Sequence, residues 1–131
     1  MRLAYFLALT PLLLSAAVQA DDCANASTQS AMNECAGKQY KQADSQLNAL
    51  YKQINSRLQD SPDSKKRLVS AQRAWVAFRD AECSFAASGV EGGSVYPMIY
   101  SGCLAELTEK RVAAFKNYLD CQEGDLSCPV R

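Results

Sequence analysis

Six cysteines constrain this chain more than any other feature, because all of them follow an export signal. The first twenty residues contain Arg2, an apolar run broken by Thr10, Pro11 and Ser15, and a final small-residue pattern, A-V-Q-A. This order is typical of a secretory signal peptide, which we expect to be cleaved after Ala20. The run is short for a membrane span and contains a proline, so we expect no membrane anchor after cleavage. An even number of cysteines in an exported chain predicts a disulfide framework.

The remaining residues, 21–131, are enough for a single domain with one modest core. The full chain has fourteen basic and fourteen acidic residues and no histidine. Removal of Arg2 with the signal leaves thirteen basic residues, so no strong positive field would attract nucleic acid. The lack of histidine excludes Ser-His-Asp and Cys-His nucleophiles and the commonest metal ligand. The sequence therefore predicts a protein that is not an enzyme and has no cofactor, metal site or nucleic-acid partner.

Three segments repeat apolar residues at three- and four-residue steps, as amphipathic helices do. We expect helices over residues 28–59, 64–87 and 98–120. Pro62 would end the first helix, and the aspartate or serine after it would cap the second. One row of the second helix would hold Leu68, Ala71, Trp75, Phe78 and Phe85. Short connections between such helices predict an all-α fold, a three-helix antiparallel up-down-up bundle with disulfides.

The position of each cysteine along the bundle axis, counted in residues from the nearest turn, suggests which cysteines pair. We expect the bridges Cys83–Cys103, Cys23–Cys35 and Cys121–Cys128. The first would join two helices beside their connecting loop, and the last would staple a short tail, residues 121–131. Each bridge would stabilise the fold by about 2–4 kcal/mol, mostly by restricting the unfolded chain. A Cys35–Cys83 bridge is the main alternative, since these two also stand at similar heights. Zinc is disfavoured because the chain has no C-x-x-C pair.

The stretch S-A-Q-R-A-W-V-A-F-R-D-A-E-C, residues 70–83, carries more polar side chains than a purely structural helix needs. A half-buried arginine within it would need an anionic partner. Asp44 and Glu106 stand at the height of Arg79, and Arg111 could meet Asp44 or lie over the Trp75 ring. We interpret a set of six residues as an inter-helix network that fixes helix register: Asp44, Gln72, Trp75, Arg79, Glu106 and Arg111. The alternative is that Gln72 and Arg79 line a binding site.

A glycine-rich segment, S-G-V-E-G-G-S-V-Y-P, joins the second and third predicted helices. Its glycines permit unusual dihedrals and leave backbone amides free. A bridge between the flanking cysteines would hold this segment in place, so binding would cost it less entropy. We therefore predict that a partner binds this glycine loop, residues 89–96, through Gly89, Glu91, Gly92, Gly93, Ser94 and Tyr96. The alternative is a simple helix connection.

Five segments, in this order, resemble the LprI-like N-terminal domain family of exported bacterial proteins: C-A-N-A-S-T-Q-S-A-M-N-E-C-A, A-D-S-Q-L-N-A-L-Y, A-Q-R-A-W-V-A-F-R-D-A-E-C, G-G-S and C-L-A-E-L-T-E-K-R. The third segment is the most specific. The resemblance covers about residues 23–119 and implies a helical, disulfide-linked envelope protein. The family takes its name from a mycobacterial lipoprotein described as a lysozyme inhibitor. This chain differs from that lipoprotein in lacking a lipid-attachment cysteine, and Cys121 and Cys128 are additional to the usual four.

The resemblance implies a periplasmic or secreted binding protein that inhibits peptidoglycan-cleaving lysozyme through protein–protein contact. In this hypothesis the glycine loop enters the enzyme's cleft, and Ser94 and backbone amides meet its catalytic carboxylates. Glu91 and the near-zero net charge oppose such an approach. The alternative is an envelope interaction or immunity module that binds another protein without inhibiting lysozyme.

Overall fold

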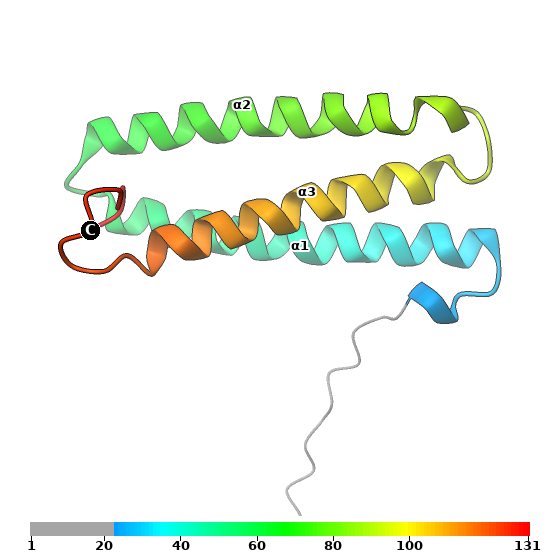
Figure 1. The fold of residues 1–131 in the computed structure, drawn as a ribbon, viewed down its shortest axis with the longest axis horizontal. Coiled ribbons are helices and arrows are strands. Elements are labelled where there is room, and N and C mark those ends of the chain that lie inside the picture. Colours follow the sequence, from blue (N-terminus) through cyan, green and yellow to red (C-terminus); the bar gives the residue numbers. More distant parts are fainter. Residues whose placement is uncertain (1–22) are drawn as a thin grey trace, which may run out of the picture.

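A computed structural model describes residues 23–131. It contains three long helices, α1 (Gln29–Arg57), α2 (Pro62–Ala86) and α3 (Tyr96–Leu119), and two short 3-10 segments, Cys23–Asn25 and Ser88–Val90. The chain runs up, down and up, so α1 and α3 are parallel and α2 is antiparallel to both (Figure 1). The predicted all-α, three-helix bundle with disulfides is confirmed. The expected signal peptide, residues 1–20, lies outside the described residues.

None of the helices within residues 23–131 combines the length and the apolar character that crossing a membrane requires.

The helix ends depend on local capping and on two prolines. α1 begins after Thr28, whose Oγ1 accepts a hydrogen bond from the Ala31 amide at 3.0 Å. Pro62 opens α2 two residues before the predicted start near residue 64. The N-cap is Ser61, so the prediction that Asp63 or Ser64 caps this helix is wrong. α3 also has a proline, Pro97, in its first turn and begins at Tyr96 instead of residue 98. Proline suits these positions because its φ is already helical and the first turn does not need its missing N–H.

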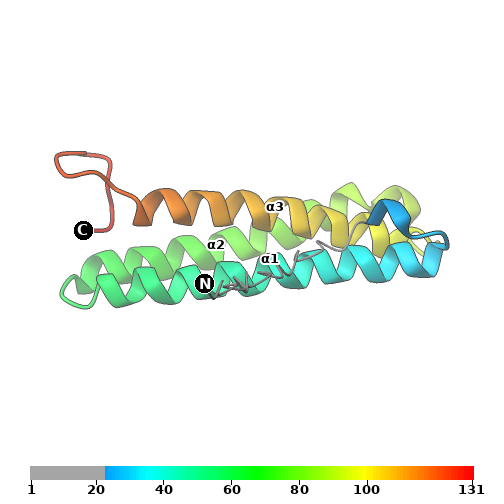
Figure 2. The ribbon, with the colours of Figure 1, turned by 90° about the horizontal axis from the view of Figure 1, so that it is seen from below.

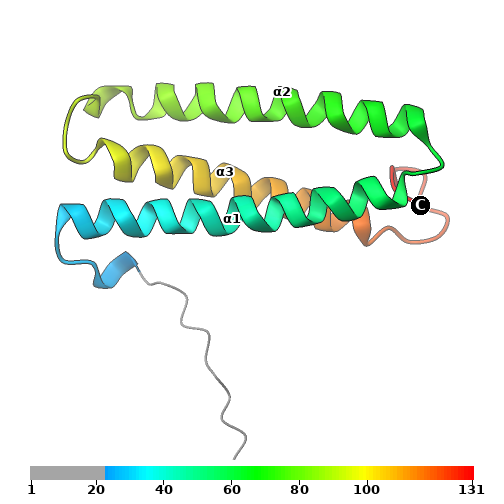
Figure 3. The same ribbon diagram turned by 180° about the vertical axis from the view of Figure 1, so that it is seen from behind.

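The backbones of α1 and α3 lie side by side along most of their length (Figure 2), while α2 stands further from both (Figure 3). Small buried side chains permit the close approach: Ala36 and Ala43 come from α1, and Ala105 from α3. The inward face of α2 carries glutamine, tryptophan and arginine side chains instead, which need more room. The spacing of the helices therefore follows from the sizes of the facing side chains.

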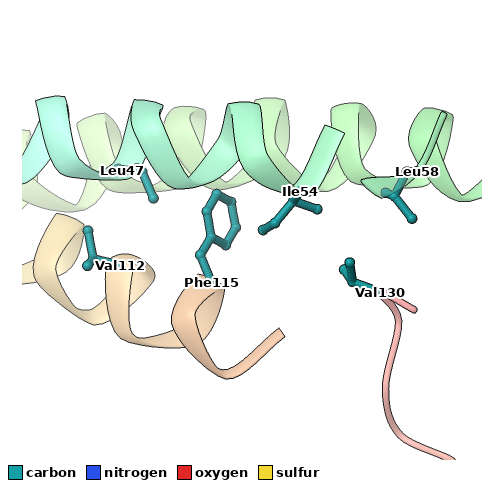
Figure 4. Close-up of a cluster of buried hydrophobic side chains, with 6 residues drawn as sticks. All are labelled: Leu47, Ile54, Leu58, Val112, Phe115 and Val130. Carbon is teal, nitrogen blue, oxygen red and sulfur yellow. The ribbon is translucent and has the colours of Figure 1, made fainter. Parts of the chain in front are cut away.

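The largest buried cluster lies in the half of the bundle near the α1–α2 turn, and Figure 4 shows its members: Leu47, Ile54, Leu58, Val112, Phe115 and Val130. The Phe115 ring is fully buried and stacks on Tyr51 with 6.3 Å between ring centroids. Val130 comes from the tail, which places this side chain next to the core with 3% of its surface exposed. The tail is therefore part of the packed structure.

α2 points two predicted row members away from the bundle. Phe78 is 55% exposed and Phe85 is 77% exposed, whereas Arg79 and Cys83 are buried. Of the predicted row, Leu68 and Trp75 pack against the core, whereas the two phenylalanines face solvent. Apolar side chains occur on opposite sides of this helix, so its helical repeat alone does not show which side faces the bundle.

Candidate functional site

Arg79 lies at the centre of a polar cluster between the helices. Its side chain is only 8% exposed, and its guanidinium contacts two carboxylates. Nη2 lies 3.0 Å from Oδ1 of Asp80, and Nη1 lies 3.7 Å from Oδ1 of Asp44. Nη1 also donates to the buried Thr108 hydroxyl at 3.5 Å. A buried charge is tolerated when it has opposite charges and hydrogen-bond acceptors around it, and Arg79 has both.

Aromatic rings complete the surroundings of this arginine. The Arg79 guanidinium lies 5.1 Å from the ring centroid of Trp75 and 5.3 Å from that of Tyr40. These distances are those of cation–π contacts, which stabilise by about 0.5–2 kcal/mol each. Burial raises the pKa of the Tyr40 phenol, although the positive charge of Arg79 acts in the opposite direction. The cluster therefore favours a neutral Tyr40 beside a charged Arg79.

A second arginine connects α3 to α2. Arg111 Nε donates to Oε1 of Gln72 at 3.1 Å. The Arg111 guanidinium lies 5.7 Å from the Trp75 ring centroid and 4.7 Å from that of Phe115. Of the two positions considered from the sequence, the structure therefore shows the one over Trp75. Trp75 lies between the two arginines and links the two halves of the cluster.

Glu106 lies outside this cluster, which corrects the expectation that it could pair with Arg79. It binds Lys110 at 3.0 Å, one turn further along α3, and both side chains are more than two-thirds exposed. Asp80 and Thr108 were not predicted as partners of Arg79. Asp80 directly follows the arginine, and this adjacency was a usable signal because Nε and Nη2 both reach its carboxylate.

The chemistry available to this cluster is limited. Among the described residues, no buried side-chain nitrogen or oxygen lacks a hydrogen-bond partner. Nor does any group of three or more His, Cys, Asp or Glu residues in this part of the chain stand ready to hold a metal ion. A cluster whose polar groups satisfy one another has little left to offer a ligand.

The three disulfides are Cys23–Cys35, Cys83–Cys103 and Cys121–Cys128, the pairings favoured from the sequence, and the Cys35–Cys83 alternative is absent from the described residues. Cys83–Cys103 joins α2 to α3 on both sides of the glycine loop, with 5.5 Å between the two Cα atoms. Cys83 is fully buried, so the bridge forms part of the packed interior at this end. The base of the loop is therefore covalently fixed.

Contacts from α1 and α3 also hold the glycine loop. Asn33 Nδ2, in the first turns of α1, donates to the Ser94 carbonyl at 2.9 Å. Tyr96 stacks on Tyr100 with 5.6 Å between ring centroids. Gly92 has a φ of 79°, a backbone conformation that other residues adopt only with strain. The loop is thus fixed by all three helices, and no sequence signal pointed to Asn33.

The loop exposes most of the residues predicted to bind a partner: Gly89, Glu91, Gly92, Gly93 and Ser94, while Tyr96 is half-buried. Not all of its amides are available, which corrects part of the expectation. The amides of Glu91, Gly93 and Tyr96 donate to carbonyls within the loop and its flanks. Within residues 23–131, the amides of Gly92 and Ser94 have no hydrogen-bond partner. The amides of Gly92 and Ser94 and the Ser94 hydroxyl are therefore among the donors that this exposed loop can offer.

Comparison with known proteins places this arrangement in a family. The family model described as Lysozyme inhibitor LprI matches residues 20–115. This chain belongs to the LprI family. The LprI match includes the Arg79 cluster, the glycine loop and the first two disulfides, but it ends before the Cys121–Cys128 tail.

The chain is also similar to an uncharacterized protein of Rhizobium meliloti (strain 1021). The two are 37% identical over 114 residues, which cover 79% of this chain and 82% of the relative. No solved structure matches the chain.

Proposed function

We propose that this protein is exported to the periplasm or the medium and inhibits a peptidoglycan-cleaving lysozyme with its glycine loop. Membership of the LprI family, whose description is lysozyme inhibitor, supports this activity. We choose the glycine loop as the binding surface because it is exposed and is held in place by the Cys83–Cys103 bridge. A segment that is already ordered loses little conformational entropy when it binds.

The available donors suit the centre of a lysozyme cleft. Such an enzyme uses two carboxyl groups that face each other across the scissile bond. The amides of Gly92 and Ser94 and the Ser94 hydroxyl would donate hydrogen bonds to these groups, and bonds to a charged acceptor are the stronger kind. Glycine at positions 92 and 93 removes side chains that would keep the backbone away from the enzyme. Inhibition would then result from occupation of the cleft.

Glu91 is the feature of the loop that opposes this binding. Its exposed carboxylate would lie beside the enzyme's own carboxylates, and like charges at an interface weaken association. We therefore expect Glu91→Gln to bind a lysozyme more tightly, by about 1 kcal/mol or roughly fivefold in the inhibition constant. This gain should shrink as salt is added, because salt screens the repulsion that the substitution removes.

A titration of cell-wall lysis with the purified protein tests the proposal, using lysozymes of several types. Inhibition should be lost in Gly92→Val, which strains the backbone at a φ of 79°, and reduced in Ser94→Ala. Leu126→Ser is the matched control, because Leu126 is 93% exposed on the tail, far along the chain from the loop. Unchanged lysis at large molar excess of the folded wild-type protein would remove the proposal.

The second candidate is an envelope interaction or immunity module that uses the same loop on another protein. The exposed Glu91 favours it, since a partner with a basic surface would attract this carboxylate. Affinity capture from periplasm separates the two candidates. Recovery of a partner without lysozyme activity, lost in Glu91→Gln, would support the module, and recovery of lysozymes alone would argue against it.

A further inference from the structure

We propose that the outer face of α2 joins two copies of this protein into an antiparallel dimer. The face carries an apolar stripe made of Ala71, Ala74, Phe78, Ala81 and Phe85, all of them exposed. Steps of three and four residues separate its members, so they lie along one side of the helix. This side points away from the buried Arg79 and Cys83, and of the stripe only Ala71, at one end, also borders the pocket between α2 and the rest of the chain.

Such a stripe differs from scattered surface apolar residues. Single exposed apolar side chains are ordinary, but a continuous row with alternating three- and four-residue steps is the pattern of a helix–helix seam. Two phenylalanines with 55% and 77% of their surface exposed give the row bulk as well as length. Small residues, Ser70, Ala77 and Ser84, lie along one edge and would let another helix approach closely.

The stripe is complementary to itself when two copies run in opposite directions. A register that places Phe78 over Ala81 of the second copy also places Phe85 over the second copy's Ala74. Twofold symmetry then repeats both contacts, so the interface contains four contacts, each between one phenylalanine ring and one alanine. A parallel arrangement would set Phe78 against its own equivalent and leave the alanines facing one another. The alternation of large and small side chains along the stripe therefore favours packing against a second copy that runs in the antiparallel direction.

Charge selects the same direction. The first turns of α2 carry Lys65, Lys66 and Arg67, and the exposed Glu91 follows the last turn of the same helix. In the antiparallel register Lys66 and Arg67 of each copy lie beside Glu91 of the other copy, and the two helix dipoles also oppose each other. Without its signal the chain has thirteen basic and fourteen acidic residues, so two copies repel each other little.

The available area predicts a dimer of modest affinity. The exposed parts of the two rings amount to about 260 Å² per copy, taking roughly 200 Å² for a phenylalanine. Alanines and flanking side chains would raise the total for both copies to about 1,000–1,200 Å², the lower end for specific association. We therefore expect dissociation in the micromolar range.

Sedimentation velocity of the oxidised, signal-free protein over about 1–300 µM tests the proposal. The wild type should shift from monomer to dimer mass across this range, and Phe78→Ser and Phe85→Ser should each raise the dissociation constant at least tenfold. Both side chains are more than half exposed, so the thermal midpoint should change little when it is measured at about 1 µM, where the wild type is monomeric. Leu126→Ser, another exposed apolar change, should leave the dimer intact. A wild type that stays monomeric throughout, or a dimer unaffected by both phenylalanine variants, would overturn the proposal.

Zero-length carbodiimide cross-linking tests the direction of the pair. Lys66 lies near the start of α2 and Glu91 lies in the loop after its end at Ala86. About 30 Å of helix therefore separates them within one chain, and they cannot be linked intramolecularly. In the antiparallel register each Lys66 approaches Glu91 of the other copy, and a link between them in the dimer band would support it. A dimer without this link would overturn the antiparallel arrangement. Phenylalanine-dependent binding of the monomer to anionic lipid vesicles, with no dimer, would assign the stripe to a membrane surface instead.

Discussion

Replacement of Arg79 by alanine tests whether the polar cluster holds the helices together. The substitution removes two carboxylate contacts, a hydrogen bond to Thr108 and two cation–π contacts at once. It also removes a buried aliphatic stem that fills the space between α2 and the α1–α3 pair. We expect the free energy of unfolding to fall substantially.

The magnitude follows from what each lost contact leaves behind. The fully buried Thr108 hydroxyl would lose its partner, at about 1–3 kcal/mol, and the two ring contacts contribute about 0.5–2 kcal/mol each. Asp44 and Asp80 are 39% and 50% exposed, so water would solvate them and no buried charge would be stranded. The expected loss is therefore about 3 kcal/mol, at the lower end for a broken buried pair.

The measurement is urea unfolding with the disulfides intact, supported by the thermal midpoint, which should fall by roughly 10–20 °C. Arg79→Met keeps most of the buried stem but loses the same Thr108 and ring contacts of the guanidinium, so it should lose less than Arg79→Ala, about 2 kcal/mol. The control is Arg73→Ala, because this arginine lies on the same helix but is exposed. A loss below about 1 kcal/mol for Arg79→Ala would refute the reasoning, since it would mean that the side chain turns into solvent and supports nothing.

Three further outcomes are expected. Thr108→Val should lower the free energy of unfolding by about 1 kcal/mol in urea melts, because Nη1 of Arg79 loses an acceptor while the shape is kept. Val130→Ala should lower it by about 1–2 kcal/mol through a cavity beside Leu58, whereas an unchanged midpoint would mean that the tail does not pack there. In spectrophotometric titration, part of the phenolate absorbance should appear above the ordinary pKa of 10.0 and be absent in Tyr40→Phe. Because folding raises this pKa, the contribution of neutral Tyr40 to stability is present below pH 10 and is lost as the pH rises through the folded-state pKa.

Local patterns explain what could be predicted of the fold. The apolar repeat located three helices to within a few residues, and the direction of each followed from the short connections between them. The same estimate of heights paired Cys83 with Cys103 and placed Asp44 beside Arg79. Such estimates work because an α-helix has a fixed rise per residue, so position along the chain converts into position along the bundle.

Predictions about the rotation of a helix were less successful, and α2 shows why. Apolar residues occur on both its sides, and although Arg79 was expected to face its partners, the periodic pattern did not reveal that Phe78 faces solvent. The rotation of α3 was equally uncertain, so Glu106 was expected to pair with Arg79. In the structure it lies on the exposed side of α3 and binds Lys110. Rotation about the helix axis depends on which partner surface is nearest, and a single helix does not contain that information.

The sequence by itself determined the helices, their order and the cysteines available to staple them, because these depend on contacts near in the chain or on simple length. The tertiary structure alone decided which face of α2 meets α1 and α3, and which amides of the glycine loop remain free to donate. Both depend on packing between segments that are distant in the sequence. There, alanine, tryptophan and arginine side chains of different size must together fill the space between the helices.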